Sequence, residues 1–183
     1  MTDFGVSSCL RDPSANPPIF EQAVRSYADA LVRYAFSIVG SSAAAEDIME
    51  DTFALLYVKG GDFLSEGHLR AWLYKVAHGK AVDYLRKHRR EVPLQDVEQV
   101  LYGGSLEEDL IRQQRDEVLY ICLQKLPPQY REVLQLHYFD GFAPAQIAAI
   151  TAIGIKQVYN RLSRGRNALK DLLIKEGISY EDI

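Results

Sequence analysis

A run of basic and amide side chains near the C-terminus is the most chemically suggestive feature of this chain. Residues 155–170 hold five Lys or Arg residues and no Asp or Glu. Such side chains donate hydrogen bonds to base edges in the DNA major groove and neutralise backbone phosphates. At helical spacing, one side of this run collects basic and amide residues, with further basic residues flanking it: Lys156, Gln157, Asn160 and Arg164, beside Arg161, Arg166 and Lys170. The pattern predicts a helix that reads duplex DNA.

Two neighbouring elements would position this helix. Its opposite side is apolar, at Ile155, Val158, Leu162, Leu169 and Leu172, which predicts packing against a bundle. Before it, a short helix is predicted over residues 144–150, because Pro suits the first turn of a helix. A tight turn at residues 152–154 follows, with Gly154 where the chain changes direction. This order is typical of a helix-turn-helix motif, although an ordinary solvated basic face would explain the last helix alone.

Composition sets the outer limits. The 183 residues are 48% hydrophobic and 25% charged, which is typical of a soluble globular protein. Cys9 and Cys122 match no metal-binding or disulfide pattern, which favours a reducing compartment. The sequence shows neither a signal-peptide pattern nor an apolar stretch of membrane-spanning length. We therefore expect a cytoplasmic protein.

Charge is distributed in blocks, although the net charge is only −4. Residues 67–90 hold seven basic residues against one Asp, whereas residues 44–66 hold six acidic residues against one Lys. Residues 96–117 are acidic as well, with seven acids against two bases. Alternating blocks of this kind indicate separate surfaces for partners of opposite charge.

Helical periodicity extends over most of the chain. We predict one helix from Ile19 to near Gly40, a second capped by Ser41 or Ser42, and a third from His68 that contains an unexplained glycine, Gly79. A glycine there should mark a kink or a close approach. The predicted fold is all-α, with two small helical bundles joined by a flexible linker. Its parts are an N-terminal arm (1–18), a first bundle (19–90), the linker (91–104), a helix-turn-helix bundle (105–175) and a short tail (176–183).

The second predicted helix carries an acidic stripe. Its inward positions are Ala45, Ile48, Met49, Thr52, Leu55 and Leu56, and its outward ones are Glu46, Asp47, Glu50 and Asp51. A solvated face is the default interpretation of such a stripe. The functional alternative is docking onto a basic protein surface.

The residue types argue against an enzyme. The four histidines, His68, His78, His88 and His137, have no metal-ligand spacing. We find no phosphate-binding glycine loop, nucleophile motif or convincing carboxylate pair. No metal, cofactor or small-molecule substrate is therefore expected.

Three stretches in order resemble one protein family. They are AEDIMEDTF at 45–53, RAWLYKVAHGKAVDYLRK at 70–87, and LPPQYREVLQLHYFDGFAPAQIAAI at 126–150 with VYNRLSRGRNAL at 158–169. Together they resemble bacterial RNA polymerase sigma factors of the extracytoplasmic-function (ECF) group. The resemblance implies a protein that binds core RNA polymerase and directs promoter-specific transcription initiation through −10 and −35 DNA elements. It also implies an anti-sigma protein as a further partner.

The resemblance assigns roles to residues of this chain. Contacts to polymerase would come from Asp47, Glu50, Asp51 and Phe53. Contacts to the −10 element would come from Lys75, His78, Lys80, Arg86, Lys87, Arg89 and Arg90. Contacts to the −35 element would come from Lys156, Gln157, Asn160, Arg161, Arg164 and Arg166. Two positions depart from the family, since Gly79 stands where Asn is usual and Gly154 where Ser or Thr is usual.

A stand-alone helix-turn-helix regulator that binds duplex DNA as a dimer is the alternative. It explains residues 126–173 equally well. It leaves the basic third helix and the acidic stripe without a shared purpose.

Overall fold

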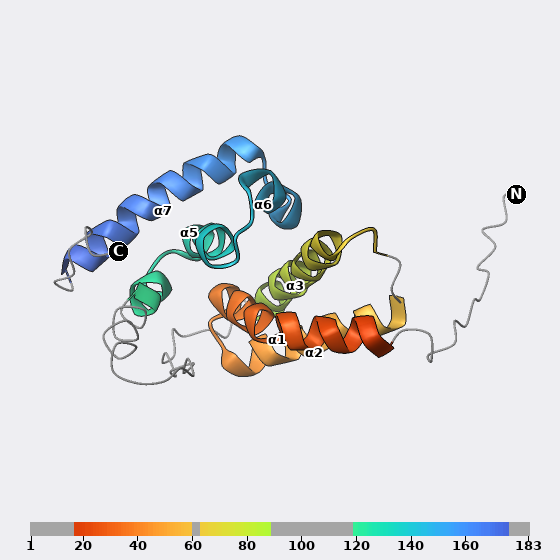
Figure 1. The fold of residues 1–183 in the computed structure, drawn as a ribbon. Coiled ribbons are helices and arrows are strands. Elements are labelled where there is room, and N and C mark those ends of the chain that lie inside the picture. Colours follow the sequence, from red (N-terminus) through yellow and green to blue (C-terminus); the bar gives the residue numbers. More distant parts are fainter. Residues whose placement is uncertain (1–16, 60–62, 89–118, 176–183) are drawn as a thin grey trace, which may run out of the picture.

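The structure, a computed structural model, describes residues 17–59, 63–88 and 119–175 (Figure 1). Three helices form an N-terminal bundle: α1 (Pro17–Val39), α2 (Ser42–Lys59) and α3 (Glu66–His88). A C-terminal bundle contains a helical stretch at 119–124, then α5 (Pro128–Leu134), the π-helical η2 (Gln135–Phe139), α6 (Pro144–Thr151) and α7 (Ile155–Lys175). These ranges contain no strand, which confirms the all-α prediction. The predicted arm, linker, tail and residues 105–118 lie outside the described ranges, apart from Pro17 and Pro18.

The α1–α2 junction follows from two small residues. Gly40 adopts a left-handed backbone with φ of 70°, and its N–H bonds to the Phe36 carbonyl at 2.9 Å. This geometry ends a helix at little steric cost only for glycine. Ser41 then caps α2, because its Oγ accepts the Ala44 N–H at 3.4 Å. The predicted stop and cap are confirmed.

The start of α3 differs from the prediction. Ser65 caps the helix, with its Oγ accepting the His68 N–H at 3.2 Å. Helix α3 therefore begins at Glu66, two residues before the predicted start at His68. A serine followed by an acidic residue in the first turn stabilises a helix N-terminus, and this signal is present in the sequence.

Apolar residues at helical spacing form the core of the N-terminal bundle. Leu31, Leu73 and Ala77 are fully buried, as are the rings of Tyr34 and Tyr74. Trp72 packs against this core and is only partly buried. The Lys59 ammonium lies 4.9 Å from its ring centroid.

The C-terminal bundle is shaped by proline and by a change of helical pitch. Pro128 begins α5, and Pro144 begins α6 as predicted, each in the first turn of its helix. Between them the chain widens into η2, where the Asp140 N–H bonds to the Gln135 carbonyl at 3.0 Å. This turn of π-helix was not predicted. It brings Asp140 and the chain before α6 toward the other bundle.

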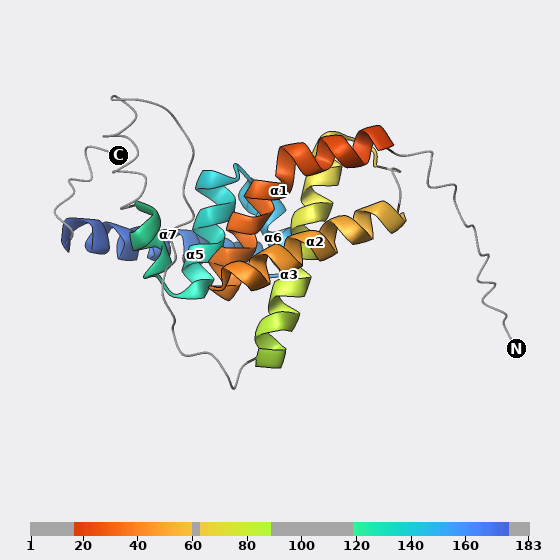
Figure 2. The ribbon, with the colours of Figure 1, turned by 90° about the horizontal axis from the view of Figure 1, so that it is seen from below.

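The two bundles pack against each other. Helix α5 lies beside α1 and α6 lies beside α3, whereas α7 lies on the far side of the C-terminal bundle (Figure 1). Figure 2 shows α3 crossing α1 and α2 at a steep angle. The ring centroids of Tyr74 in α3 and Phe142 before α6 are 4.8 Å apart. Aromatic contact therefore joins the two bundles.

Candidate nucleic-acid and protein interfaces

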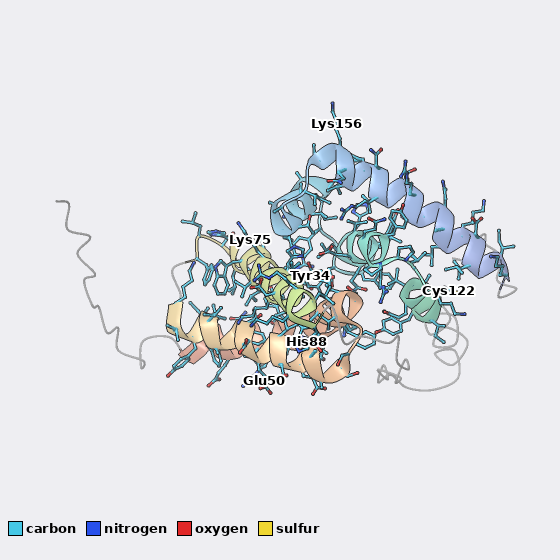
Figure 3. All side chains as sticks on the ribbon, turned by 180° about the vertical axis from the view of Figure 1, so that it is seen from behind. Tyr34, Glu50, Lys75, His88, Cys122 and Lys156 are labelled. Atoms are coloured by element: carbon cyan, nitrogen blue, oxygen red, sulfur yellow. The ribbon has the colours of Figure 1, made fainter. Side chains whose placement is uncertain are left out.

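Helix α7 presents a basic, hydrogen-bonding face to solvent. Lys156, Gln157, Asn160 and Arg164 are exposed, and Arg161 is half-buried. Figure 3 shows Lys156 pointing away from the rest of the molecule. The structure therefore brings the predicted DNA-reading side chains onto one open surface.

The buried side of α7 holds this face in place. Val158 and Leu162 are buried as predicted, but Ile155 is 44% exposed. The prediction for Ile155 was wrong because it is the first residue of α7 and precedes the contacts with the bundle. Gly165 is buried instead, and a Cβ added there would lie 3.1 Å from Leu134 Cδ1. Helices α5 and α7 thus approach closely at a residue that sequence analysis missed.

The turn between α6 and α7 places its unusual backbone at Ala152. This residue is left-handed, with φ of 56° and ψ of 26°, whereas Gly154 has no positive φ. Gly154 accepts the Gln157 and Val158 N–H groups through its carbonyl, at 2.8 and 3.1 Å. The predicted turn at 152–154 is confirmed, but the residue in it with a left-handed backbone is Ala152 rather than Gly154.

Arg166 lies further along α7 and has a partner on the C-terminal bundle itself. Its Nη1 donates to the Tyr138 hydroxyl at 3.3 Å. Both side chains are exposed. Arg166 is thus tied to η2 while remaining at the surface.

The basic residues of α3 differ in their exposure to solvent and in their ion pairing. Lys75 and Lys87 are exposed, and Arg86 is exposed with a surface ion pair to Asp83 at 3.0 Å. Lys80 pairs with Asp51 of α2 at 2.7 Å. The predicted Arg89 and Arg90 lie outside the described residues.

His78 is not a free surface residue. Its side chain is only 18% exposed, and its Nδ1 lies 2.7 Å from Glu132 Oε1 of α5. The C-terminal bundle therefore covers most of the His78 side chain, which the resemblance assigns to the −10 element. Neighbouring Gly79 is exposed, and a Cβ added there meets no atom within 4 Å. Gly79 therefore does not mark a close approach.

The acidic stripe lies on the opposite side of the molecule from the α7 face. Glu46, Asp47, Glu50 and Asp51 are all exposed, and Figure 3 shows Glu50 pointing outward on the side remote from Lys156. The stripe continues into apolar surface, where Leu55 is 44% and Val58 is 83% exposed. Leu55 was predicted to face inward, but Thr52 and Leu56 take the two inward positions and leave it at the edge.

Phe53 does not belong to this exposed stripe. It is 4% exposed, and its ring lies edge-on to that of Phe20 with centroids 6.3 Å apart. Its expected contact with polymerase is corrected to a core position. Its place one residue after Thr52, which is also buried, sets it on the inner side of α2.

Buried polar residues between the bundles were missed by sequence analysis. Glu132 and Asp140 of the C-terminal bundle are 8% and 5% exposed. The Tyr34 hydroxyl donates to Glu132 Oε1 at 3.1 Å, and the Tyr74 hydroxyl donates to Asp140 Oδ1 at 2.9 Å. The Arg70 guanidinium donates to the backbone carbonyl of Asp140. No local pattern distinguishes these acids from surface residues.

Burial dominates the electrostatics of this cluster. It raises the pKa of Tyr34 well above its ordinary value, and Glu132 raises it further. Burial and then Asp140 raise the pKa of Tyr74. Burial also raises the pKa of Asp140 to about 6, although hydrogen bonds from Tyr74 and Gln135 and the charges of Arg33 and Arg70 lower it. Both phenols therefore remain protonated donors near neutral pH.

The described residues contain neither a metal-binding cluster nor a membrane-spanning helix. Within residues 17–59, 63–88 and 119–175, no group of three or more His, Cys, Asp or Glu residues could hold a metal ion. In the same part of the chain, no helix has the length and apolar character needed to cross a membrane.

Comparisons with known proteins agree with this arrangement. Residues 23–91 match the Sigma-70 region 2 family, and residues 116–169 match the Sigma-70, region 4 family. The chain is 29% identical over 166 residues to ECF RNA polymerase sigma factor SigW of Bacillus subtilis (strain 168), covering 84% of this chain and 88% of SigW. It is 27% identical over 162 residues to SigM of the same organism, covering 88% and 98%.

Solved structures are similar over both bundles. The sigma factor RpoE in complex with the anti-sigma factor NepR, from Bartonella quintana, superposes with a TM-score of 0.68 at 27% identity, covering 85% of this chain and 96% of RpoE. CnrH in complex with the cytosolic domain of CnrY gives a TM-score of 0.60 at 25% identity, covering 89% and 92%.

Proposed function

The chain belongs to the ECF group of the sigma-70 family and directs promoter-specific initiation of transcription, and we propose that three of its helices divide this task. Helix α2 docks on core RNA polymerase, α3 contacts the −10 element and α7 reads the −35 element. The observation that carries the proposal is the placement of the basic α7 face and the acidic α2 stripe on opposite sides of the molecule. DNA and polymerase then approach without competing for one surface.

The −35 surface consists of exposed donors along α7: Lys156, Gln157, Asn160, Arg164 and Arg166, with the half-buried Arg161 beside them. Lys, Arg, Asn and Gln match the acceptors of bases in the major groove, whereas flanking basic residues reach phosphates. Exposure along one helical side supports this role.

The −10 surface lies along α3. Lys75, Arg86 and Lys87 are exposed there, and Lys80 and His78 join them once their acidic partners are displaced. Basic side chains at such spacing attract the backbone of an opened DNA strand. Arg89 and Arg90 continue the same basic run in the sequence.

The polymerase surface is the outward stripe of α2. Asp47, Glu50 and Asp51 supply its charge, and Leu55 and Val58 add apolar area at the same helical side. A charged rim around apolar contacts is typical of protein interfaces. Exposed apolar side chains in line with the acids support docking over a merely solvated face.

Organisation and partners complete the proposal. Residues 19–90 form the region 2 domain, 91–104 the linker and 105–175 the region 4 domain, flanked by an arm (1–18) and a tail (176–183). The protein acts in the cytoplasm without catalysing a reaction and without a cofactor. An anti-sigma protein is a further partner, supported by the similarity to RpoE in its complex with NepR. A stand-alone regulator is not proposed, because it does not explain the match to region 2.

Co-elution with bacterial core RNA polymerase on a sizing column tests the proposal. The wild type should co-elute, and Asp47→Lys with Glu50→Lys should not. These two acids are preferred to Asp51, whose replacement would also break its ion pair with Lys80.

The matched control is Asp29→Lys with Asp171→Lys, which changes the net charge equally at exposed acids of α1 and α7. The control should co-elute. Loss of binding in both double variants would point to net charge rather than α2, and no binding by the wild type would reject the proposed docking.

A further inference from the structure

Gly79 weakens the helix that contains it, and the folded chain gives no reason for a glycine there. Helix α3 runs from Glu66 to His88 and includes it. Gly79 is exposed and has no positive φ, and a Cβ added there would meet no atom within 4 Å. Glycine inside a helix is less stable than alanine, because it loses more backbone freedom on folding. The chain therefore keeps a destabilising residue at a position where alanine would fit.

The surroundings of Gly79 are basic on both sides. Lys75 lies one turn before it and Val82 one turn after it, and both side chains are exposed, Val82 at 45%. Arg86, two turns after Gly79, is exposed as well and pairs with Asp83 at 3.0 Å. The missing side chain thus leaves the α3 backbone uncovered between two cationic groups, with the apolar Val82 beside it.

The chemistry of this surface fits an opened DNA strand. Glycine lets a ligand approach the helix backbone more closely than any other residue does. The flat face of a base can lie on the uncovered backbone against the Val82 methyl groups, while neighbouring phosphates meet the Lys75 ammonium and the Arg86 guanidinium. Asp83 also faces this surface, and Arg86 balances its charge. A guanidinium has five donors, so Arg86 can serve Asp83 and a phosphate together.

We propose that Gly79 is the floor of a base-binding site on α3, in which one base of the opened −10 strand lies against the helix backbone between Lys75 and Arg86. Glycine determines specificity here through the absence of a side chain. The site accepts every base at this position, because no side chain at residue 79 reads its hydrogen-bonding groups. The inference rests on the proposed −10 role of α3 and deepens it.

Two measurements with opposite expected signs test the site. Gly79→Ala should raise the melting temperature of the full-length protein by about 2–4 °C, because alanine is the stronger helix former. In holoenzyme reconstituted with bacterial core RNA polymerase, Gly79→Ala should bind promoter DNA about threefold more weakly and Gly79→Leu about tenfold more weakly, because their side chains occupy the place of the base. The probe is a promoter duplex selected from a random library with the wild-type holoenzyme, and fluorescence anisotropy gives its Kd.

Ser26→Ala in α1 is the matched control. It also replaces an exposed, weaker helix former by alanine inside a helix. It should raise the melting temperature slightly and leave promoter binding unchanged. Weaker binding by both alanine variants would overturn the site, because stabilisation alone would then explain the loss. Unchanged binding by folded Gly79→Leu protein would overturn it as well.

Lys75→Ala distinguishes failure of this inference from failure of the proposed −10 role of α3. Weakened binding by Lys75→Ala together with normal binding by Gly79→Leu would reject the Gly79 site alone. Normal binding by both variants would reject the −10 role of α3 and the site with it.

The specificity is tested by selection from promoter duplexes randomised across the −10 element. The wild-type holoenzyme should accept every base at one position of this element. Gly79→Asn should acquire a preference at that same position, because a side-chain amide can donate to and accept from a base edge. A Gly79→Asn profile identical to that of the wild type would overturn the specificity-determining role of Gly79.

Discussion

Arg164 is the residue of α7 at which we predict the largest single contribution to −35 recognition. It is exposed in the middle of the basic face, where a guanidinium can donate two hydrogen bonds to guanine. We expect Arg164→Ala to weaken binding to a −35 duplex, obtained by selection from a random library, by about 1–3 kcal/mol for a base contact. A phosphate contact would give a smaller loss and a shallower salt dependence.

Asn167→Ala, an exposed change further along α7, serves as the control in the same anisotropy titrations. Equal affinity of Arg164→Ala and the wild type at low salt would remove Arg164 from the DNA face.

Ala152 carries the backbone strain of the helix-turn-helix motif. Among the described residues other than glycine, it alone has a positive φ, 56°. This conformation costs an L-residue about 1–2 kcal/mol, and glycine avoids that cost. After allowing for the entropy that glycine loses on folding, we expect Ala152→Gly to stabilise the protein by about 0.5–1 kcal/mol in urea unfolding.

The control for Ala152 is Ala149→Gly, an exposed alanine inside α6. Its replacement should destabilise the helix by about 1 kcal/mol. The two Ala→Gly changes, three residues apart, should therefore have opposite signs. The same sign for both would argue against strain at Ala152.

Among the elements, α5 and α7 are held together at Gly165. A Cβ there would lie 3.1 Å from Leu134 Cδ1 and 3.2 Å from Tyr130 Cβ. A larger side chain must therefore push the helices apart. We expect Gly165→Leu to lower the free energy of unfolding by about 1–3 kcal/mol and to weaken −35 binding, because the α7 face would shift.

Asn167→Leu adds a leucine two residues further along α7, at an exposed position. It should change stability by less than about 0.5 kcal/mol. Chemical denaturation of both variants measures the difference. If Gly165→Leu is as stable as Asn167→Leu, the close approach of α5 and α7 is not a constraint.

Most helices were predictable from sequence because their signals are local. Gly40 and Ser41 mark the α1–α2 junction, and Pro144 marks the start of α6. The π-helical turn at Gln135–Phe139 was not predictable, because its residues differ in no evident way from those of an α-helix. Gly79 was interpreted as the site of a kink or a close approach because glycine disfavours helices. Helix α3 nevertheless includes it, since a low helix propensity does not exclude glycine from a helix.

At the scale of the whole molecule, the contact between the two bundles could not be predicted from the sequence. Tyr34 and Glu132 are separated by 98 positions, and no periodicity links residues so distant. The sequence also predicts surface positions for Glu132 and Asp140, because isolated acids are seldom buried. The exposure of the residues that we propose to face DNA and polymerase was easier to predict, since exposure is the default for their residue types. Phe53 was the exception, because its assignment came from resemblance rather than from its helical position.

The stability of the whole molecule should depend on pH through Asp140. Its pKa in the folded protein is raised to about 6 from an ordinary 3.8, so the folded state binds this proton more tightly than the unfolded chain. Its contribution to stability is therefore present below the unfolded pKa and is lost as the pH rises through 6. Between pH 7 and pH 5 we expect the wild type to gain on the order of 1 kcal/mol relative to Asp140→Asn.

Urea unfolding of both proteins at pH 5, 6 and 7 measures this difference, in which the titration of other groups cancels. The neighbours that face Asp140 are Tyr74, Gln135, Arg33 and Arg70, and all are retained in the variant. A difference that does not change with pH would show that Asp140 does not titrate in this range.

The covalent connection between the two bundles lowers the affinity that their contact requires. Because both belong to one chain, docking is unimolecular, and tethered modules typically meet at effective concentrations in the millimolar range. The contact combines buried hydrogen bonds to Glu132 and Asp140 with apolar packing such as Phe142 against Tyr74, and a tether lowers the affinity that it needs in order to persist. A contact of modest intrinsic strength can therefore hold the two bundles together, whereas the same contact between separate molecules would require about millimolar concentrations.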